Sequence, residues 1–270
     1  MLYIYSLILG IVQGITEFVP VSSSGHLVVL HDIINFNVVD SLAFDVALHL
    51  GTVLAVIIFF RIEILRYIVA ILEIFIPKRK VNRQDLSEVL LIIYATIPAA
   101  IIGFLFEDAI KKLFRNTITV IITLVLGAML FFLVEKYAKH YKNFSGMGIG
   151  RALYIGLAQA LALIPGVSRS GITIVAGMSV KLKRSEAARF SFLLSAPIIL
   201  GAGVLKLREI EWSLLPAEEI GMFIIGFISS FIVGFFVIKY FLKFLQHHNL
   251  NVFGWYRIGL ALLLSAWLIF

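Results

Sequence analysis

Six apolar stretches constrain this sequence most, because each approaches the roughly 20 residues that a membrane-spanning helix needs. They are Leu42–Phe60, Leu90–Phe106, Ile118–Val134, Ala188–Val204, Met222–Val237 and Phe253–Phe270. Hydrophobic residues make up 61% of the chain and charged residues 14%, whereas soluble domains average about 45–50% and about 25%. The sequence therefore predicts an all-α polytopic membrane protein with about six spanning helices.

Two further apolar segments are interrupted near their middles. Residues 2–34 are broken within residues 13–26, QGITEFVPVSSSGH, and residues 149–180 are broken within residues 165–171, PGVSRSG. Each segment is long enough for two half-helices, and non-helical backbone at membrane depth is tolerated only inside protein or beside a wet cavity. We therefore expect two re-entrant helical hairpins.

The two interrupted segments resemble each other. A shift of 146 residues aligns Gln13 with Gln159 and the Val-Ser-x-Ser-Gly run at residues 21–25 with that at residues 167–171. This agreement predicts an internal repeat. Gln159 is expected to hydrogen-bond to the facing hairpin.

Basic residues predict the topology, because Lys and Arg gather in cytoplasmic loops. Alternate loops and their flanks carry Arg61, Arg66, Lys78, Arg79, Lys80, Arg83, Lys136, Lys139, Lys142, Arg151, Lys181, Lys183, Arg184, Arg189, Lys239 and Lys243. The opposite side receives only Lys111, Lys112, Arg115, Lys206 and Arg208. The net charge of +7 is therefore interpreted as a positive-inside pattern and not as a sign of nucleic-acid binding. The two hairpins then enter from opposite faces, the first from outside. The prediction is one integral membrane domain, residues 1–270, with inverted repeat halves of approximately 1–135 and 149–270.

Three smaller features complete the predicted architecture. The stretch Arg61–Phe75 is interpreted as a cytoplasmic extension of the preceding span, and Glu107–Arg115 as a short amphipathic helix on the outer surface. Asp45 and His49 lie four residues apart on one helix face. Asp45 and His49 are interpreted as a buried polar pair, and the alternative is a metal or proton site.

Glu17 is the first candidate for chemistry. A carboxylate at membrane depth costs at least about 2.5 kcal/mol, so it is expected to serve as a metal ligand or general base. The alternative is a glutamate near the interface, hydrated through the break. Gln13 shares its helix face. The chain has no cysteine, which excludes a thiol nucleophile.

The serine-rich run after Glu17 predicts an anion site. Ser24 is a plausible N-cap for the half-helix that follows. Free N–H groups at that helix start, the hydroxyls of Ser22, Ser23 and Ser24, and close approach at Gly25 suit a phosphate group. His26 comes directly afterwards and is a candidate nucleophile or base.

The second break supplies a cation. Arg169 has a planar guanidinium that suits bidentate phosphate binding. The alternative is a structural ion pair between Arg169 and Glu17, which an empty site could hold until substrate arrives. The other candidate phosphate-binding residues here are Gly166, Ser168, Ser170 and Thr173.

Together these motifs resemble the undecaprenyl-diphosphate phosphatase family, also called bacitracin-resistance protein, over essentially the whole chain. The residues that carry the resemblance are Gln13, Glu17, Phe18, Pro20, Ser22, Ser23, Gly25, His26, Pro165, Gly166, Ser168, Arg169, Ser170, Thr173 and the run 187–192, AARFSF. The resemblance implies an enzyme of the bacterial cytoplasmic membrane that removes the terminal phosphate of the C55 isoprenoid diphosphate and so recycles the peptidoglycan carrier lipid.

The family's functional residues map onto Glu17, Ser23, His26 and Arg169. The family uses a divalent cation, Mg²⁺ or Ca²⁺, for which Glu17 and Gln13 are the candidate ligands here. Some members have Glu at the position of Gln13, so a two-carboxylate metal site is not expected. The resemblance also implies a fold of inverted repeats with re-entrant hairpins.

The sequence thus predicts hydrolysis of a polyprenyl diphosphate at a site that opens toward the outer face, with the lipid tail between helices in the bilayer. The sequence does not decide whether Ser23, His26 or water is the attacking group. It also leaves open whether the protein forms a homo-oligomer. The main alternative is a transporter or flippase of a polyprenyl phosphate lipid. A type-2 phosphatidic-acid phosphatase is only faintly indicated by Ser24-Gly25-His26, without a companion motif.

Overall fold

The computed structural model describes residues 2–34, 41–76, 80–114, 116–138, 142–209 and 215–269. The described part of the chain is built from helices, with one isolated bridge between Lys142 and Leu182. In chain order the helices are α1 (Leu2–Thr16), α2 (Ser23–Ile34), α3 (Ser41–Phe59), α4 (Arg61–Glu73), α5 (Arg83–Phe114), α6 (Thr117–Tyr137), η1 (Phe144–Gly146), α7 (Ile149–Ala160), η2 (Leu161–Leu163), α8 (Arg169–Ser179), α9 (Arg184–Glu209), α10 (Ala217–His247) and α11 (Asn251–Ile269).

Within the described residues, five of the six predicted spanning helices are long and apolar enough on their own to cross a membrane. They are α6, α9, α10, α11 and residues 83–106 of α5. A sixth span is formed if α3 and α4 are counted as one bent pair. The chain is therefore a multi-pass membrane protein with an all-helical fold.

Two sequence predictions about helix boundaries were wrong. Helix α4 does not extend α3, because the chain bends by 78° between them at Phe60, whose φ of −94° and ψ of 18° depart from helical geometry. The predicted separate helix at Glu107–Arg115 is not separate, because α5 runs unbroken to Phe114. Residues 104–114 contain no glycine or proline that would interrupt it.

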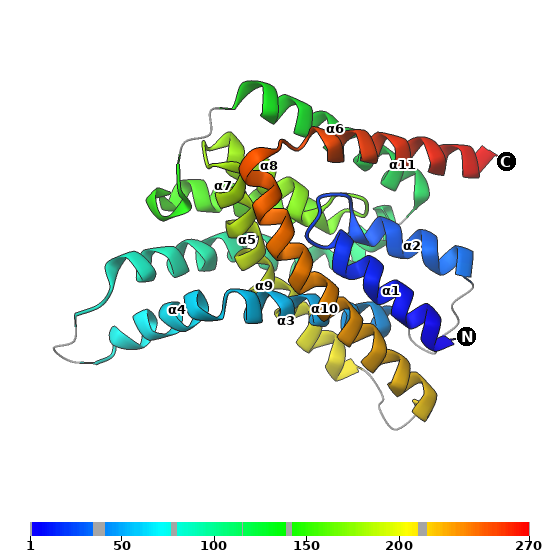
Figure 1. The fold of residues 1–270 in the computed structure, drawn as a ribbon, viewed down its shortest axis with the longest axis horizontal. Helices are drawn as coiled ribbons and strands as arrows, with labels where there is room; N and C mark the ends of the chain where they lie inside the picture. Colours follow the sequence, from blue (N-terminus) through cyan, green and yellow to red (C-terminus); the bar gives the residue numbers. More distant parts are fainter. Residues whose placement is uncertain are drawn as a thin grey trace.

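Each interrupted segment folds as two helices that pack on each other, α1 against α2 and α7 against α8. Helix α1 also packs on α10, whereas α7 packs on α5. Helices α6 and α11 run side by side, and α10 crosses the molecule diagonally in Figure 1. Each broken segment therefore lies against a long helix from the other half of the chain.

Each break is partly buried in the protein, at residues 20–22 in the first and at Gly166 and Ser168 in the second. Phe18, beside Glu17, is 1% exposed and packs edge to face on Phe192 of α9, with ring centroids 5.0 Å apart. Phe131 of α6 is equally buried in the same hydrophobic core.

Candidate functional site

The first break is ordered by Ser22. Its φ of +75° lies in the left-handed region, where a non-glycine residue is uncommon. Its Oγ accepts a hydrogen bond from the backbone N–H of Gly25 at 3.3 Å. Ser22 is therefore the N-cap of α2, and the predicted cap at Ser24 was wrong because the helix already begins at Ser23.

The second break is ordered by Gly166 and Ser168. Gly166 has φ +84°, and a Cβ there would lie 2.1 Å from Thr123 Oγ1, so both conformation and space require glycine. Ser168 caps α8 by accepting a hydrogen bond from the N–H of Gly171 at 3.1 Å. The helix begins at Arg169, which places this side chain directly after the break.

Glu17 joins the two breaks. Its Oε1 accepts a hydrogen bond from Arg169 Nη2 at 2.7 Å, and its Oε2 accepts from Ser23 Oγ at 2.8 Å and from Gln13 Nε2 at 3.0 Å. Glu17 is 5% exposed. The structure thus brings four predicted site residues together, and it contains the predicted ion pair between Glu17 and Arg169. Glu17, Arg169, Ser23 and Gln13 form a polar cluster.

Neighbouring residues fix the position of Arg169 through hydrogen bonds. Its Nη1 donates to the backbone carbonyl of Ser191 at 3.2 Å, and its own carbonyl accepts from Thr173 Oγ1 at 2.7 Å. Thr173 and Ser191 also share a hydroxyl hydrogen bond of 2.7 Å. The sequence did not single out Ser191, which orients both the guanidinium and the threonine from α9.

Several predicted phosphate-binding hydroxyls have structural partners. The Ser168 and Ser170 hydroxyls lie 3.1 Å apart, and both residues are buried, as are Ser22 and Thr173. Ser24 is exposed and Ser23 partly so. In this arrangement Ser23 and Ser24 are the hydroxyls that an incoming ligand can reach without rearranging a cap.

His49 is not among the predicted site residues, but it lies beside the polar cluster. Its Nδ1 lies 2.8 Å from the backbone carbonyl of Asp45, and its Nε2 lies 3.6 Å from Glu17 Oε2. The interpretation of Asp45 and His49 as a self-contained pair missed this second contact. An ionisable residue within a spanning segment is a functional candidate, and that signal could have identified His49.

His26 lies beside the cluster and uses other partners. One ring nitrogen, Nδ1, is 2.8 Å from the carbonyl of Ser22, and Nε2 is 2.7 Å from the Tyr256 hydroxyl. Tyr256 comes from α11, 230 residues away in the sequence. Sequence reasoning did not find it, because one tyrosine in an apolar span carries no local signal.

Arg257 connects both breaks to α6. It is 1% exposed, and its guanidinium donates to the carbonyls of Leu124 at 3.1 Å, Thr123 at 2.9 Å, Gly166 at 3.2 Å and Pro20 at 3.4 Å. Sequence reasoning missed it as well. A lone arginine inside the last apolar stretch was the signal that could have found it, since such a charge is costly in a membrane.

Gln159 does not make the predicted hydrogen bond. It is buried, and neither Nε2 nor Oε1 has a partner within the described residues. The alignment of Gln159 with Gln13 therefore does not extend to their contacts, because Leu163 stands four residues beyond Gln159, where Glu17 stands beyond Gln13.

The polar cluster offers oxygen ligands for a cation. Oε1 of Gln13 is buried and has no partner among the described residues, and the Glu17 carboxylate is adjacent. No group of three His, Asp or Glu side chains within the described ranges is arranged to hold a metal ion. Mg²⁺ and Ca²⁺ are hard cations that prefer oxygen ligands. The oxygens of Gln13 and Glu17 could therefore hold one of them together with oxygens of substrate or water.

Known proteins match this chain over nearly its full length. The family model described as bacitracin resistance protein BacA matches residues 6–263. The undecaprenyl-diphosphatase of Rubrobacter xylanophilus is 44% identical over 98% of this chain and 97% of its own. That of Alcanivorax borkumensis is 41% identical over 97% and 98%, and that of Thermodesulfovibrio yellowstonii 42% over 96% and 95%. The chain therefore belongs to the bacitracin resistance protein BacA family.

Proposed function

We propose that this protein hydrolyses undecaprenyl diphosphate to undecaprenyl phosphate and phosphate, and that the cluster around Glu17 and Arg169 is its active site. The relatives' names and the family support the reaction. The observation that supports the site is the 2.7 Å pair between Glu17 and Arg169, because it joins the two breaks. The experiment that tests the proposal is phosphate release by purified protein in detergent.

The residues of the cluster have distinct roles in this proposal. The terminal phosphate takes the place of the Glu17 carboxylate on Arg169, whose fork binds two phosphate oxygens. Catalysis of phosphoryl transfer rests mainly on positioning and charge neutralisation, which Arg169 and the N–H groups at the start of α2 supply. Ser23, within reach of Glu17, either attacks the phosphate or orients the attacking water.

A divalent cation is part of the proposal. The Glu17 carboxylate and the unpartnered Gln13 oxygen would hold Mg²⁺ or Ca²⁺ beside the phosphate. When bound, such an ion neutralises charge on the diphosphate. His49 brings a further polar group to the same carboxylate.

An apolar groove beside the first break is suited to the isoprenoid tail. It has a volume of about 590 Å³, within the range of ligand pockets of roughly 300–1,000 Å³. Its lining is Val19, Ile232, Val233, Phe236, Val237, Tyr240, Phe241, Phe244, Val252 and Phe253. Val19 lines the groove and is two residues from Glu17 in the sequence, which supports placing the tail here when the diphosphate is at the site.

Filling the groove is expected to weaken binding of the long substrate alone. Val252→Trp should raise KM for undecaprenyl diphosphate about tenfold, equivalent to about 1.4 kcal/mol of lost apolar burial. KM for isopentenyl diphosphate, whose tail is too short to follow the groove, should not change. Leu262→Trp is the matched control, because Leu262 is exposed elsewhere on α11. Equal KM changes for both substrates would contradict the groove assignment.

The two halves are proposed to be an inverted repeat. The paired packing of α1 on α10 and α7 on α5 supports this. So do two glycines related by the same shift of 146 residues. A Cβ at Gly10 would lie 2.6 Å from the carbonyl of Gly226 in α10, and a Cβ at Gly156 would lie 2.3 Å from the carbonyl of Ala95 in α5. Both hairpins therefore use an equivalent glycine for close helix packing.

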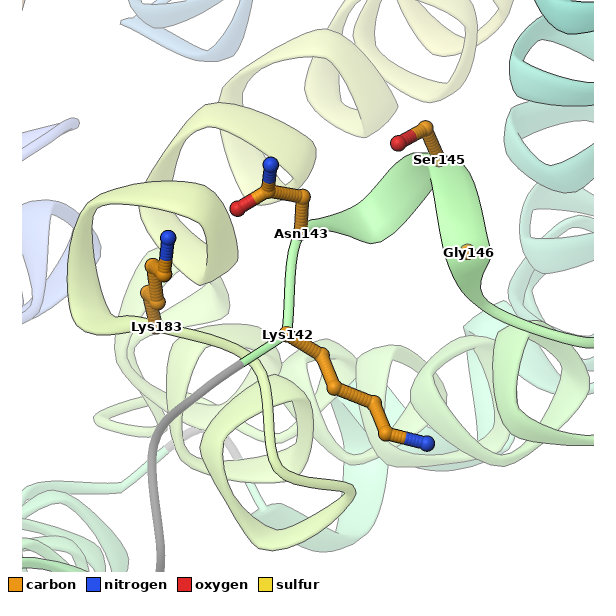
Figure 2. A pocket seen from close by; sticks show the side chains of 5 residues that line it. All are labelled: Lys142, Asn143, Ser145, Gly146 and Lys183. Carbon is orange, nitrogen blue, oxygen red and sulfur yellow. The ribbon is translucent and has the colours of Figure 1, made fainter.

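The proposed orientation places the basic end of the molecule in the cytoplasm. Lys142 pairs through its backbone with Lys181 and Lys183. Figure 2 shows a shallow pocket there, lined by Lys142, Asn143, Ser145, Gly146 and Lys183. Positive charge of this kind is typical of the cytoplasmic side. The first hairpin, which carries Glu17, then enters from the outside.

This orientation predicts the side from which the site can be labelled. In a chain without cysteine, Ser24→Cys should react with a membrane-impermeant maleimide in intact cells, because Ser24 is exposed beside the site. Lys183→Cys on the basic end should react only after lysis. The reverse labelling pattern would show that the site opens to the cytoplasm.

A further inference from the structure

The proposed reaction does not use the contact between His26 and Tyr256. The two rings are nearly parallel, with an interplanar angle of 11° and centroids 5.8 Å apart. The Tyr256 hydroxyl lies 2.7 Å from His26 Nε2. Tyr256 is about half exposed, so the tyrosine ring is not needed to fill the core.

Tyr256 is held in place by the next residue. Arg257 binds carbonyls of both breaks and of α6, which fixes the register of α11 against the breaks. A Cβ at Gly127 of α6 would lie 2.3 Å from Arg257 Nη2, so α6 closely encloses this guanidinium. The position of the Tyr256 hydroxyl on His26 is therefore set by the same contacts that hold the two breaks together.

The hydrogen bonds define the tautomer of neutral His26. The carbonyl of Ser22 can only accept, so Nδ1 carries the ring proton. The lone pair of Nε2 then accepts a hydrogen bond from the Tyr256 hydroxyl. Both ring nitrogens are thus engaged, and Nε2 meets other groups only through Tyr256 or after this hydrogen bond breaks.

We propose that Tyr256 is the positioning residue of His26 and relays a proton to it, so that His26 acts as a base and not as the acceptor of the phosphoryl group. The proton of the attacking hydroxyl passes to the Tyr256 oxygen, while the tyrosine's own proton passes to Nε2. An O–H bond of the attacking group breaks, an N–H bond forms on His26, and Tyr256 is unchanged. The freed oxygen pair forms the new P–O bond, and the bridging P–O bond breaks to release undecaprenyl phosphate. If water attacks, the terminal phosphoryl group leaves as phosphate; if Ser23 attacks, it stays on the serine until a water molecule, deprotonated by the same route, releases it as phosphate. This role rests on the proposed active site.

The test removes only the hydroxyl. Tyr256→Phe keeps the ring and should lower kcat about 10²-fold, the lower range for general acid–base catalysis, with KM and melting temperature unchanged. Tyr137→Phe, at an exposed tyrosine of α6, should retain wild-type kcat. Nitrogen-15 NMR of histidine-labelled protein should show the His26 Nε2 resonance, assigned by its loss in His26→Gln, shifted in Tyr256→Phe.

The outcomes separate this inference from the proposed function. Wild-type or raised kcat in Tyr256→Phe, or a lowered kcat with an unshifted His26 resonance, overturns the role of Tyr256. A phosphohistidine trapped at His26 also overturns it. Full activity of His26→Gln also overturns it, whereas a wild type that releases no phosphate overturns the proposed function itself.

Discussion

Replacing Arg169 by alanine is expected to reduce the rate of phosphate release by about 10³-fold or more, the scale on which an arginine acts in phosphoryl transfer. Arg169→Lys keeps the positive charge but loses the two-pronged guanidinium, whose Nη1 and Nη2 reach the Ser191 carbonyl and Glu17 at the same time. Its kcat should therefore fall by roughly 10²-fold. Steady-state assays of both variants against undecaprenyl diphosphate measure these effects.

The control for Arg169 is Arg151→Ala, which removes an exposed arginine at the start of α7 and should leave kcat and KM unchanged. Removing one partner of a buried ion pair also destabilises the fold by about 3–5 kcal/mol. Melting temperature in detergent must therefore be measured alongside activity. A well-folded Arg169→Ala variant with wild-type activity would exclude Arg169 from the site.

Replacing Arg257 by methionine is expected to lower the stability of the fold strongly. Four carbonyls lose this donor. Those of Thr123 and Leu124 lie within α6, whereas those of Pro20 and Gly166 lie outside the helices and have no intrahelical hydrogen bond, and each unsatisfied buried group costs about 1–3 kcal/mol. With partial relaxation, a loss of about 3 kcal/mol lowers the melting temperature by roughly 6 °C or more. Activity should fall with it, because the two breaks lose their common anchor.

The matched control is Arg208→Met, at an exposed arginine near the end of α9. This variant should keep the wild-type melting temperature. If Arg257→Met melted like the wild type and remained active, the carbonyl contacts of Arg257 would not be what fixes the breaks.

The sequence predicted the parts of the fold that depend on local pattern. Apolar length identified the spanning helices, and glycine, serine and proline identified both breaks. It failed where a boundary depends on local backbone geometry. The bend after α3 occurs at Phe60, an apolar residue without a turn signal, and the helix at residues 107–114 merely continues α5.

The site was predictable where its residues were chemically unusual for a membrane. Glu17 and Arg169 stood out as charges in the two breaks, and the structure pairs them. Tyr256 and Ser191 did not stand out, because their roles come from contacts over long separations of 230 residues to His26 and 22 residues to Arg169. His49 and Arg257 carried a signal, a polar group within a span, but nothing local indicated which break each would contact.

We propose that the protein is a cation-assisted phosphatase whose active site joins the two breaks at Glu17. The most direct test of this proposal is phosphate release from undecaprenyl diphosphate in detergent by the purified wild type and Glu17→Gln, with and without EDTA. We expect the wild type to release phosphate, to lose this activity in EDTA and to recover it on added Mg²⁺ or Ca²⁺. Glu17→Gln should release almost none. A wild type that releases no phosphate, as a flippase would, or a fully active Glu17→Gln variant, would contradict the proposal.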